Sequence, residues 1–508
     1  MPRRHRYLGD LDAATDVHFK DHFCESRELP RLEGCHSDIV FGSKGVGKTA
    51  LRRALAELHR AEFFATKTID LDHISFAQVH DALSALRDAS KTEIATLARN
   101  TWRNVLAMYC LEAVAEHLPY NGALRQKILA LLAEEDFVGR DSNTRLIGYI
   151  ERLFLLVAEA GLEAPEAAPL GLTKHQRSLV NGFPSNPSVK ALLEEASAAV
   201  AKTGKGVLIC LDGFDSIVDH TPASRRAIFA GLIDAVHKSA RDPLFARAFC
   251  FKAFLPQELT ETAHAIVWDA DKFIDHTHYI RWSEAEFQNF LKRRLLQYSK
   301  SRSNQFADVW HEFMPDRVRN EVHRIDENSF QYVLRHTLYR PRQLLTHLQR
   351  ILDRWDETSD AFRVDPTFIA PVVARTNYDL AQSVVNQLEV AHPGFDAFMR
   401  SWNGAQNVIT VAQFQERLKK VFECPSAQEA NQLFSTLFNF GIFGIAPKAA
   451  LTKGSQQTRF RFGFVGDRFA PNIHAAVEGS DFVGLSPMFH EFCGSSPSEY
   501  GAVIPMAN

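Results

Sequence analysis

The stretch "FGSKGVGKTAL", residues 41–51, decides the fold prediction, because it contains the phosphate-loop pattern G-x-x-x-x-G-K-[ST]. The apolar run "SDIVF" before it predicts a short buried strand, and "GKTALRRALAELHRAE" after it has the apolar spacing of a helix. A glycine-rich turn between a strand and a helix is the setting in which backbone N–H groups surround a phosphate. We therefore predict a nucleotide site here rather than a flexible basic turn.

Each fixed position of the loop has a chemical role. Its glycines let the backbone wrap around the phosphates, Lys48 reaches the β- and γ-phosphates, and the Thr49 hydroxyl binds magnesium. The predicted cofactors are therefore ATP and Mg²⁺. The predicted nucleotide contacts of the loop are Gly42, Ser43, Lys44, Gly45, Val46, Gly47, Lys48, Thr49 and Ala50.

A phosphate loop needs an acidic partner, which we expect at the end of a neighbouring strand. The apolar run "VLICLDGFD", residues 207–215, closes on two acids. We predict Asp212 as the second magnesium ligand beside Thr49 and as part of the catalytic site. Asp215 is either the group that orients or deprotonates the attacking water, or an acid that caps the next helix.

Composition limits the class of protein. The chain has 508 residues, of which 45% are hydrophobic and 23% charged, so it is long enough for about three globular domains. A net charge of -3 gives no global basicity that would indicate a nucleic-acid partner. Seven widely separated cysteines fit no zinc spacing and predict reduced thiols. Without a secretory signal or a run of about 18 apolar residues, we expect a soluble cytoplasmic protein with no membrane partner.

Alternation of strands and helices predicts an α/β fold with a mostly parallel sheet. Further strands are expected in "FFATKTIDLD", "VLICLDGFD", "RAFCFKAFL" and "KFIDHTHYIRW". The C-terminal pattern of helix, helix, strand, polar turn and strand, in residues 408–465, predicts a winged helix. The expected domains are a P-loop nucleotide domain (1–282, with a helical insertion at about 81–161), a helical lid (283–360) and a winged-helix domain (361–508).

Several motifs carry a family resemblance. "LDGFDSI" resembles the acid motif of the STAND class of P-loop ATPases, which belong near AAA+ and origin-recognition ATPases, although Ser216 stands where that motif usually has Glu. "FCFKAFLPQEL" is similar to the fourth core strand of such ATPases, and the resemblance makes Gln257 the candidate sensor of the γ-phosphate. "TLYRPRQLLTHLQRIL" resembles their sensor-two helix, which implies a phosphate contact from Arg340 or Arg342.

The whole combination is similar to a bacterial stand-alone family of P-loop ATPases that often lies beside defence genes. The resemblance implies a slowly hydrolysing ATPase that acts as a nucleotide-controlled conformational and assembly switch, in anti-phage defence. It also implies a homo-oligomer or a complex with an effector protein, in which an arginine of a neighbouring subunit completes the site. Candidates for that arginine, among which we do not choose, are Arg225, Arg226, Arg241 and Arg247.

Two alternatives remain open. One is a DNA-binding initiator or loader that uses the winged helix on nucleic acid; it predicts a salt-dependent DNA affinity that falls when Arg459 and Arg461 become Ala. The other is a nucleotide-stabilised scaffold with negligible turnover. Basic residues near the predicted wing either contact a phosphate backbone, face a protein or are solvated; they are Arg417, Lys419, Lys420, Lys448, Lys453, Arg459 and Arg461.

Overall fold

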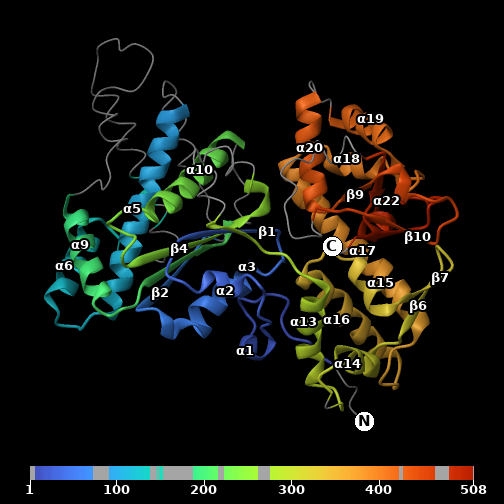
Figure 1. Cartoon of the computed structure of the whole chain (residues 1–508), viewed down its shortest axis with the longest axis horizontal. Coiled ribbons are helices and arrows are strands. Elements are labelled where there is room, and N and C mark those ends of the chain that lie inside the picture. Colours follow the sequence, from blue (N-terminus) through green and yellow to red (C-terminus); the bar gives the residue numbers. More distant parts are fainter. Residues whose placement is uncertain are drawn as a thin grey trace. The chain divides into compact units, whose positions relative to one another are not determined.

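The computed structural model divides into two compact units, which are described separately (Figure 1). The sheet unit consists of residues 25–44 and 48–280, and the C-terminal unit consists of residues 1–24, 45–47 and 281–508. Among the described residues, no helix combines the length and the apolar character that crossing a bilayer requires. The structure describes residues 6–71, 91–137, 146, 148–150, 152, 187–214, 222–260, 275–301, 303–422, 427–463 and 480–506.

A five-stranded parallel sheet forms the centre of the sheet unit, in the order β2-β3-β4-β1-β5. This confirms the predicted α/β fold with a parallel sheet. Every residue of β3 and β4 is buried, as expected for apolar strands that are covered on both faces. The strands are β1 (Asp38–Gly42), β2 (Ala65–Asp70), β3 (Val207–Asp212), β4 (Phe249–Pro256) and β5 (Thr277–Tyr279).

Helices cover this sheet, and two of them pack especially closely. A Cβ atom added at Gly231 of α10 would lie 2.5 Å from the Cβ of Ala98 in α5, so only glycine allows this approach. The predicted helical insertion at 81–161 contains α5 and α6. The helical elements of the unit are α2 (Leu29–Leu32), α3 (Lys48–Arg53), the π-helical turn η1 (Ala54–Leu58), η2 (Arg60–Glu62), α5 (Lys91–His117), α6 (Ala123–Glu134), α9 (Pro187–Ala201), α10 (Pro222–Ser239) and η4 (Gln257–Leu259).

The strand order corrects one expectation. Asp212 ends β3, which pairs with β2 and β4, whereas the phosphate loop follows β1, which pairs with β4 and β5. The acid-bearing strand is therefore not the immediate neighbour of the loop strand, because β4 lies between them. All five strands are parallel, so their carboxyl ends still meet at one edge of the sheet. Asp212 can thus reach the loop from two strands away.

One hydrophobic core of the C-terminal unit joins its helices around buried aromatic residues such as Trp310 and Phe313. The N-terminal segment is part of this unit, because Arg6 donates a hydrogen bond from Nε to Asp356 Oδ2 at 2.9 Å. The helix α13 begins with a capping box, in which Ser283 and Glu286 satisfy each other's backbone N–H groups. The elements here are α1 (Phe19–His22), α13 (Glu284–Leu296), α14 (Phe306–Phe313), β6 (Arg317–Asn320), β7 (Ile325–Asn328), α15 (Ser329–Arg335), α16 (Pro341–Thr358) and α17 (Pro366–Ala391).

A second core of the same unit differs from the predicted wing. The helix–helix–strand order is present, but the strand that pairs with β9 is β11, which lies between β8 and β9 in an antiparallel sheet. The predicted second wing strand, β10, pairs with β12 instead and reaches β9 through a single bridge between Ile445 and Arg461. The elements are α18 (Phe395–Arg400), β8 (Val408–Thr410), α19 (Val411–Phe422), α20 (Ala427–Phe440), β9 (Phe443–Ala446), η5 (Lys448–Ala450), β10 (Gln457–Phe460), β11 (Phe482–Leu485), η6 (Pro487–Phe489), α22 (His490–Cys493) and β12 (Ala502–Pro505).

Burial of His347 on α16 predicts an acid-sensitive C-terminal unit. Its ring is fully buried, Nε2 lies 3.3 Å from the His336 carbonyl oxygen, and burial lowers the pKa of His347 to about 4. The unfolded chain binds a proton near pH 6.5 and the folded chain near pH 4, so stability falls as the pH falls through this window. We expect His347 to lower the free energy of unfolding by about 3 kcal/mol between pH 7 and pH 4. Urea unfolding of the full chain at pH 7 and pH 4 measures this difference in unfolding free energy.

The variant His347→Gln keeps a donor toward His336 and does not titrate, so its unfolding free energy should depend less on pH. His18→Gln, which changes an exposed histidine of the same unit, is the matched control. An identical pH dependence in wild type and His347→Gln would contradict this assignment.

Candidate nucleotide-binding site

The phosphate loop leaves β1 after Gly42 and enters α3 at Lys48. Gly45 and Gly47 have φ angles of 82° and 109°, in the region that glycine adopts without strain. The Lys48 side chain is buried, and its Nζ donates hydrogen bonds to the carbonyl oxygens of Gly42 at 2.8 Å and Ser43 at 3.4 Å. The ammonium group is therefore held inside the loop, at the place where the pattern predicts phosphate.

The structure brings the two predicted magnesium ligands together. The Thr49 hydroxyl donates a hydrogen bond to the Asp212 carboxylate, which also accepts one from the Gly213 N–H. Asp212 is 4% exposed. Burial raises its pKa, and the charges of Arg52 and Lys48 oppose that rise. A hydroxyl and a carboxylate in contact are the hard oxygen donors that Mg²⁺ prefers, so the residues present fit this metal.

Arg52 is a member of the site that the sequence analysis missed. Its Nε donates to Asp212 Oδ2 at 3.0 Å, and its Nη1 donates to Thr68 Oγ1 at 3.3 Å. Both partners of the ion pair are largely buried, with side chains 11% and 6% exposed. The signal was its position four residues after Lys48, which places both side chains on the same face of one helix. Arg52 neutralises the carboxylate that the predicted magnesium would use.

Of the other acids near Asp212, the structure describes Asp70 but not Asp215. Asp70 ends β2 and pairs in register with Asp212, so a second acid lies at the same edge of the sheet. Residues that pair in register project to the same face of the sheet. The predicted water-orienting residue Asp215 and its neighbour Ser216 lie outside the described residues.

Gln257 lies against the phosphate loop. It follows β4, and its Oε1 accepts a hydrogen bond from Ser43 Oγ at 2.6 Å. A side-chain amide at this position can report a change in the loop through one hydrogen bond. Its role as a sensor of the γ-phosphate stays a prediction.

The middle of the loop, Gly45–Gly47, groups with the C-terminal unit. Within that unit, Trp282 Nε1 donates to the Val46 carbonyl oxygen at 2.8 Å, and the Arg342 N–H donates to the Gly45 carbonyl oxygen at 3.4 Å. A Cβ atom added at Gly45 would lie 3.3 Å from Arg342 Cβ. The loop backbone is thus fixed by two residues that precede or begin helices of this unit.

The two arginines of the predicted sensor helix have different surroundings. Arg340 is buried and is the N-cap residue of α16, whose first residue is Pro341. Arg342 Nε donates to the Leu11 carbonyl oxygen at 3.0 Å, and its Nη2 lies 3.7 Å from Asp12 Oδ1. The Arg342 guanidinium therefore faces the N-terminal segment in this structure.

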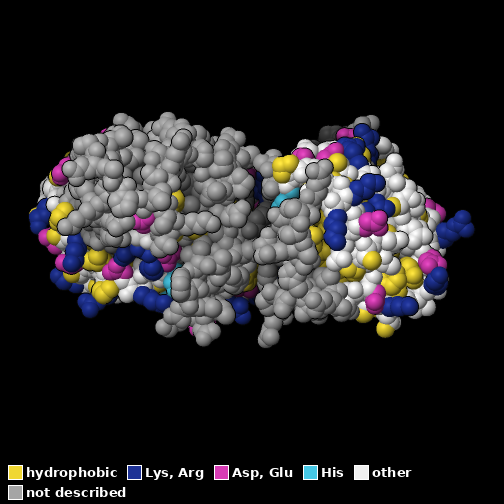
Figure 2. All heavy atoms as spheres, turned by 90° about the horizontal axis from the view of Figure 1, so that it is seen from above, with side chains coloured by type: hydrophobic (Ala, Val, Ile, Leu, Met, Phe, Trp, Pro, Cys, Tyr) yellow, Lys and Arg dark blue, Asp and Glu magenta, His cyan; other side chains and the backbone are white. Residues whose placement is uncertain are grey.

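On the face in Figure 2, the described Lys and Arg side chains of the C-terminal unit are scattered, with some Asp and Glu side chains among them. Lys453 Nζ lies 2.9 Å from Glu499 Oε1, and the Arg417 guanidinium lies over the Trp402 ring at 5.5 Å. Within the described residues, the DNA-binding alternative stays a prediction. Six of the predicted contacts are exposed: Lys419, Lys420, Lys448, Lys453, Arg459 and Arg461.

Two of the four arginines proposed to act on a neighbouring subunit have described side chains. Arg241 and Arg247 follow α10 and are exposed. Arg225 and Arg226 lie on α10, but their side chains are outside the described residues.

The comparisons with known proteins give a distant structural likeness and no match to a family model or a curated protein. Among solved structures, the chain is similar to the ORC2 protein of Aeropyrum pernix in ADPNP-ADP complexes, with 11% sequence identity and a TM-score of 0.36. The alignment covers 85% of this chain and 88% of that chain. A likeness at this level carries no inference about what the present chain binds.

Proposed function

We propose that this protein is a P-loop ATPase of the AAA+ and STAND kind, which binds Mg²⁺-ATP and acts as a conformational and assembly switch. The observation that carries the proposal is the contact between Thr49 and Asp212, beside the buried ammonium group of Lys48. A hydroxyl, a carboxylate and a lysine at one loop are the groups that a metal-bound triphosphate needs.

Each residue has a defined part in this proposal. The loop amides and Lys48 would bind the phosphates, after the ammonium group exchanges its carbonyl partners for phosphate oxygens. Thr49 and Asp212 would hold Mg²⁺, which supplies charge neutralisation on the phosphates. Arg52 would have to share or release Asp212 for that to happen. Because Ser216 replaces the usual Glu, we expect slow hydrolysis.

Coupling to the rest of the chain would pass through the loop backbone. Val46 and Gly45 are held by Trp282 and Arg342 inside the C-terminal unit. A nucleotide that reshapes the loop must change those hydrogen bonds, and only a difference in affinity between two states can shift their populations. ATP and ADP differ at the γ-phosphate, so we propose that they favour different arrangements of the two units. The family resemblance suggests phage infection as the setting.

Light scattering tests this proposal through the mass of the full-length protein in its apo, ADP-bound and ATP-bound forms. We expect the ATP form to have a larger mass or to retain an effector protein that the ADP form releases. The same mass in all three forms, with no retained partner, would contradict the assembly switch while leaving nucleotide binding intact.

A further inference from the structure

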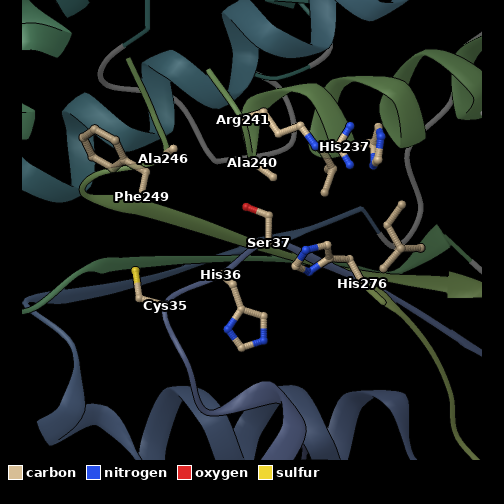
Figure 3. A pocket seen from close by; sticks show the side chains of 11 residues that line it. Cys35, His36, Ser37, His237, Ala240, Arg241, Ala246, Phe249 and His276 are labelled. Atoms are coloured by element: carbon tan, nitrogen blue, oxygen red, sulfur yellow. The ribbon is translucent and has the colours of Figure 1, made fainter. Parts of the chain in front are cut away.

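A small cavity lies at the edge of the sheet opposite the nucleotide site. It has a volume of about 200 Å³ and lies where β1, β4 and β5 begin. Figure 3 shows Cys35, His36 and Ser37 on the segment that leads into β1, with His237 of α10 and Arg241, which follows α10, above them. None of these residues belongs to the phosphate loop, so the cavity is independent of the proposed ATPase site.

Two thiols meet beside this cavity. Cys35 is exposed and lines the cavity, whereas Cys250 is buried in β4. Cys250 Sγ donates to the Val207 carbonyl oxygen at 3.3 Å, and a Cβ atom added at Gly206 would lie 2.0 Å from Cys35 Sγ. Both sulfur atoms therefore lie close to the backbone of the adjacent residues Gly206 and Val207. The two thiols also form a hydrogen bond with each other.

The surroundings make the two thiols chemically different. The hydrogen-bonding contact with Cys250 and the positive charge of Lys252 lower the pKa of Cys35, although partial burial opposes them. Burial raises the pKa of Cys250 well above its usual range. Lys252 is fixed nearby, because its Nζ donates to the Gly34 carbonyl oxygen at 3.1 Å. An exposed thiol with a lowered pKa next to a buried thiol is the arrangement of a reactive cysteine and its resolving partner.

The other cysteines lack this combination. Cys24, Cys110, Cys210 and Cys493 are buried, so a small oxidant in solvent does not reach their sulfur atoms directly. Cys424 lies outside the described residues. Within the part of the chain that the structure describes, Cys35 is the exposed cysteine, and a second thiol is in contact with it.

We propose that Cys35 and Cys250 form a redox-active pair that a small hydroperoxide oxidises to an intramolecular disulfide. The Cys35 thiolate attacks the terminal peroxide oxygen; an S–O bond forms, the O–O bond breaks, and the leaving oxygen takes a proton to become an alcohol, or water for hydrogen peroxide. The Cys250 sulfur then attacks the Cys35 sulfur; the S–S bond forms, the S–O bond breaks, and the hydroxide leaves with the Cys250 proton as water. Two thiols lose two electrons, and the peroxide gains them.

Mass spectrometry tests the pair in the full-length protein without any nucleotide. Reduced protein is treated with hydrogen peroxide, the remaining thiols are alkylated, and the peptides are mapped. We expect a linked pair of peptides that contain Cys35 and Cys250, with a loss of about two mass units before alkylation. In Cys250→Ser we expect a sulfenic acid at Cys35 that dimedone traps. Cys493→Ser, which removes a buried thiol of the C-terminal unit, should form the same link as wild type.

Cys35→Ser changes an exposed residue and keeps the test valid if the buried Cys250→Ser variant fails to fold. It should form no disulfide and leave Cys250 reduced. The proposal is overturned if wild-type protein shows no link between Cys35 and Cys250 at peroxide concentrations that oxidise Cys35, or if Cys35→Ser forms a peroxide-dependent disulfide through Cys250. Either result leaves the proposed nucleotide site untouched.

Discussion

Lys48→Ala is expected to weaken Mg²⁺-ATP binding by about a hundredfold or more, equivalent to ~2.7 kcal/mol. The Lys48 ammonium group is buried in the loop and hydrogen-bonded to Gly42 and Ser43, so it can approach phosphates without entering from solvent. Alanine removes the side-chain cation that is held inside the loop, while the loop amides remain. Fluorescence titration with a labelled ATP analogue, followed by competition with unlabelled ATP, measures the loss.

The control for Lys48→Ala is Lys127→Ala, which removes an exposed lysine of α6 that pairs with Glu195 at 3.1 Å. Its ATP affinity should equal that of wild type. An unchanged affinity in Lys48→Ala would contradict the proposed site, provided that the variant keeps the far-ultraviolet circular dichroism spectrum of wild type.

Asp212→Asn is expected to abolish the dependence of ATP binding on magnesium and to reduce ATP hydrolysis by about a hundredfold. The amide keeps the shape of the side chain but removes the negative charge that would hold the metal beside Thr49. Arg52→Gln should instead strengthen magnesium binding, because it removes the cation that pairs with Asp212 at 3.0 Å. Less magnesium should then be needed for half-maximal ATP binding.

Arg52→Gln also has an expected cost in stability. It leaves the buried Asp212 carboxylate without its ion-pair partner, a change of about 3 kcal/mol for a buried pair. The matched control is Arg53→Gln, because Arg53 is the next residue and pairs with Glu57 on the surface. If Arg52→Gln and Arg53→Gln have the same magnesium dependence, Arg52 does not regulate the carboxylate.

The pH dependence of magnesium binding tests the same carboxylate. Burial raises the pKa of Asp212, so protonation begins at a higher pH than for an ordinary aspartate. A protonated carboxyl is a poor magnesium ligand, and the magnesium-dependent part of ATP affinity should therefore fall as the pH falls through that raised pKa. Asp212→Asn should lack this part of the pH profile.

The sequence predicts the loop better than its surroundings. The pattern around Lys48 is local, and each of its fixed residues has a chemical role. One stretch of sequence therefore predicts the strand, the turn and the helix. Contact between Thr49 and Asp212 depends on distant segments, and it was predictable because parallel strands end at one edge. The position of β4 between β1 and β3 could not be predicted from the sequence, since strand order depends on the packing of the whole sheet.

Arg52 shows why part of the site was missed. An arginine on a helix after the loop is usually solvated, and its spacing of four residues from Lys48 gives the helix face without naming the buried acid as its partner. The sequence also does not predict which strands pair in the C-terminal unit. β10 was expected beside β9 because they are near in sequence, but β11 takes that place and β10 pairs with β12. Pairing between remote strands is decided by the shared core rather than by local pattern.

Isothermal titration calorimetry of the wild-type chain with ATP, in the presence and absence of magnesium, tests the central claim most directly. The account predicts saturable heat for one site per chain, tighter binding when magnesium is present, and loss of that difference in Asp212→Asn. No saturable heat with magnesium and ATP, from protein that is folded by circular dichroism, would contradict the proposed nucleotide site.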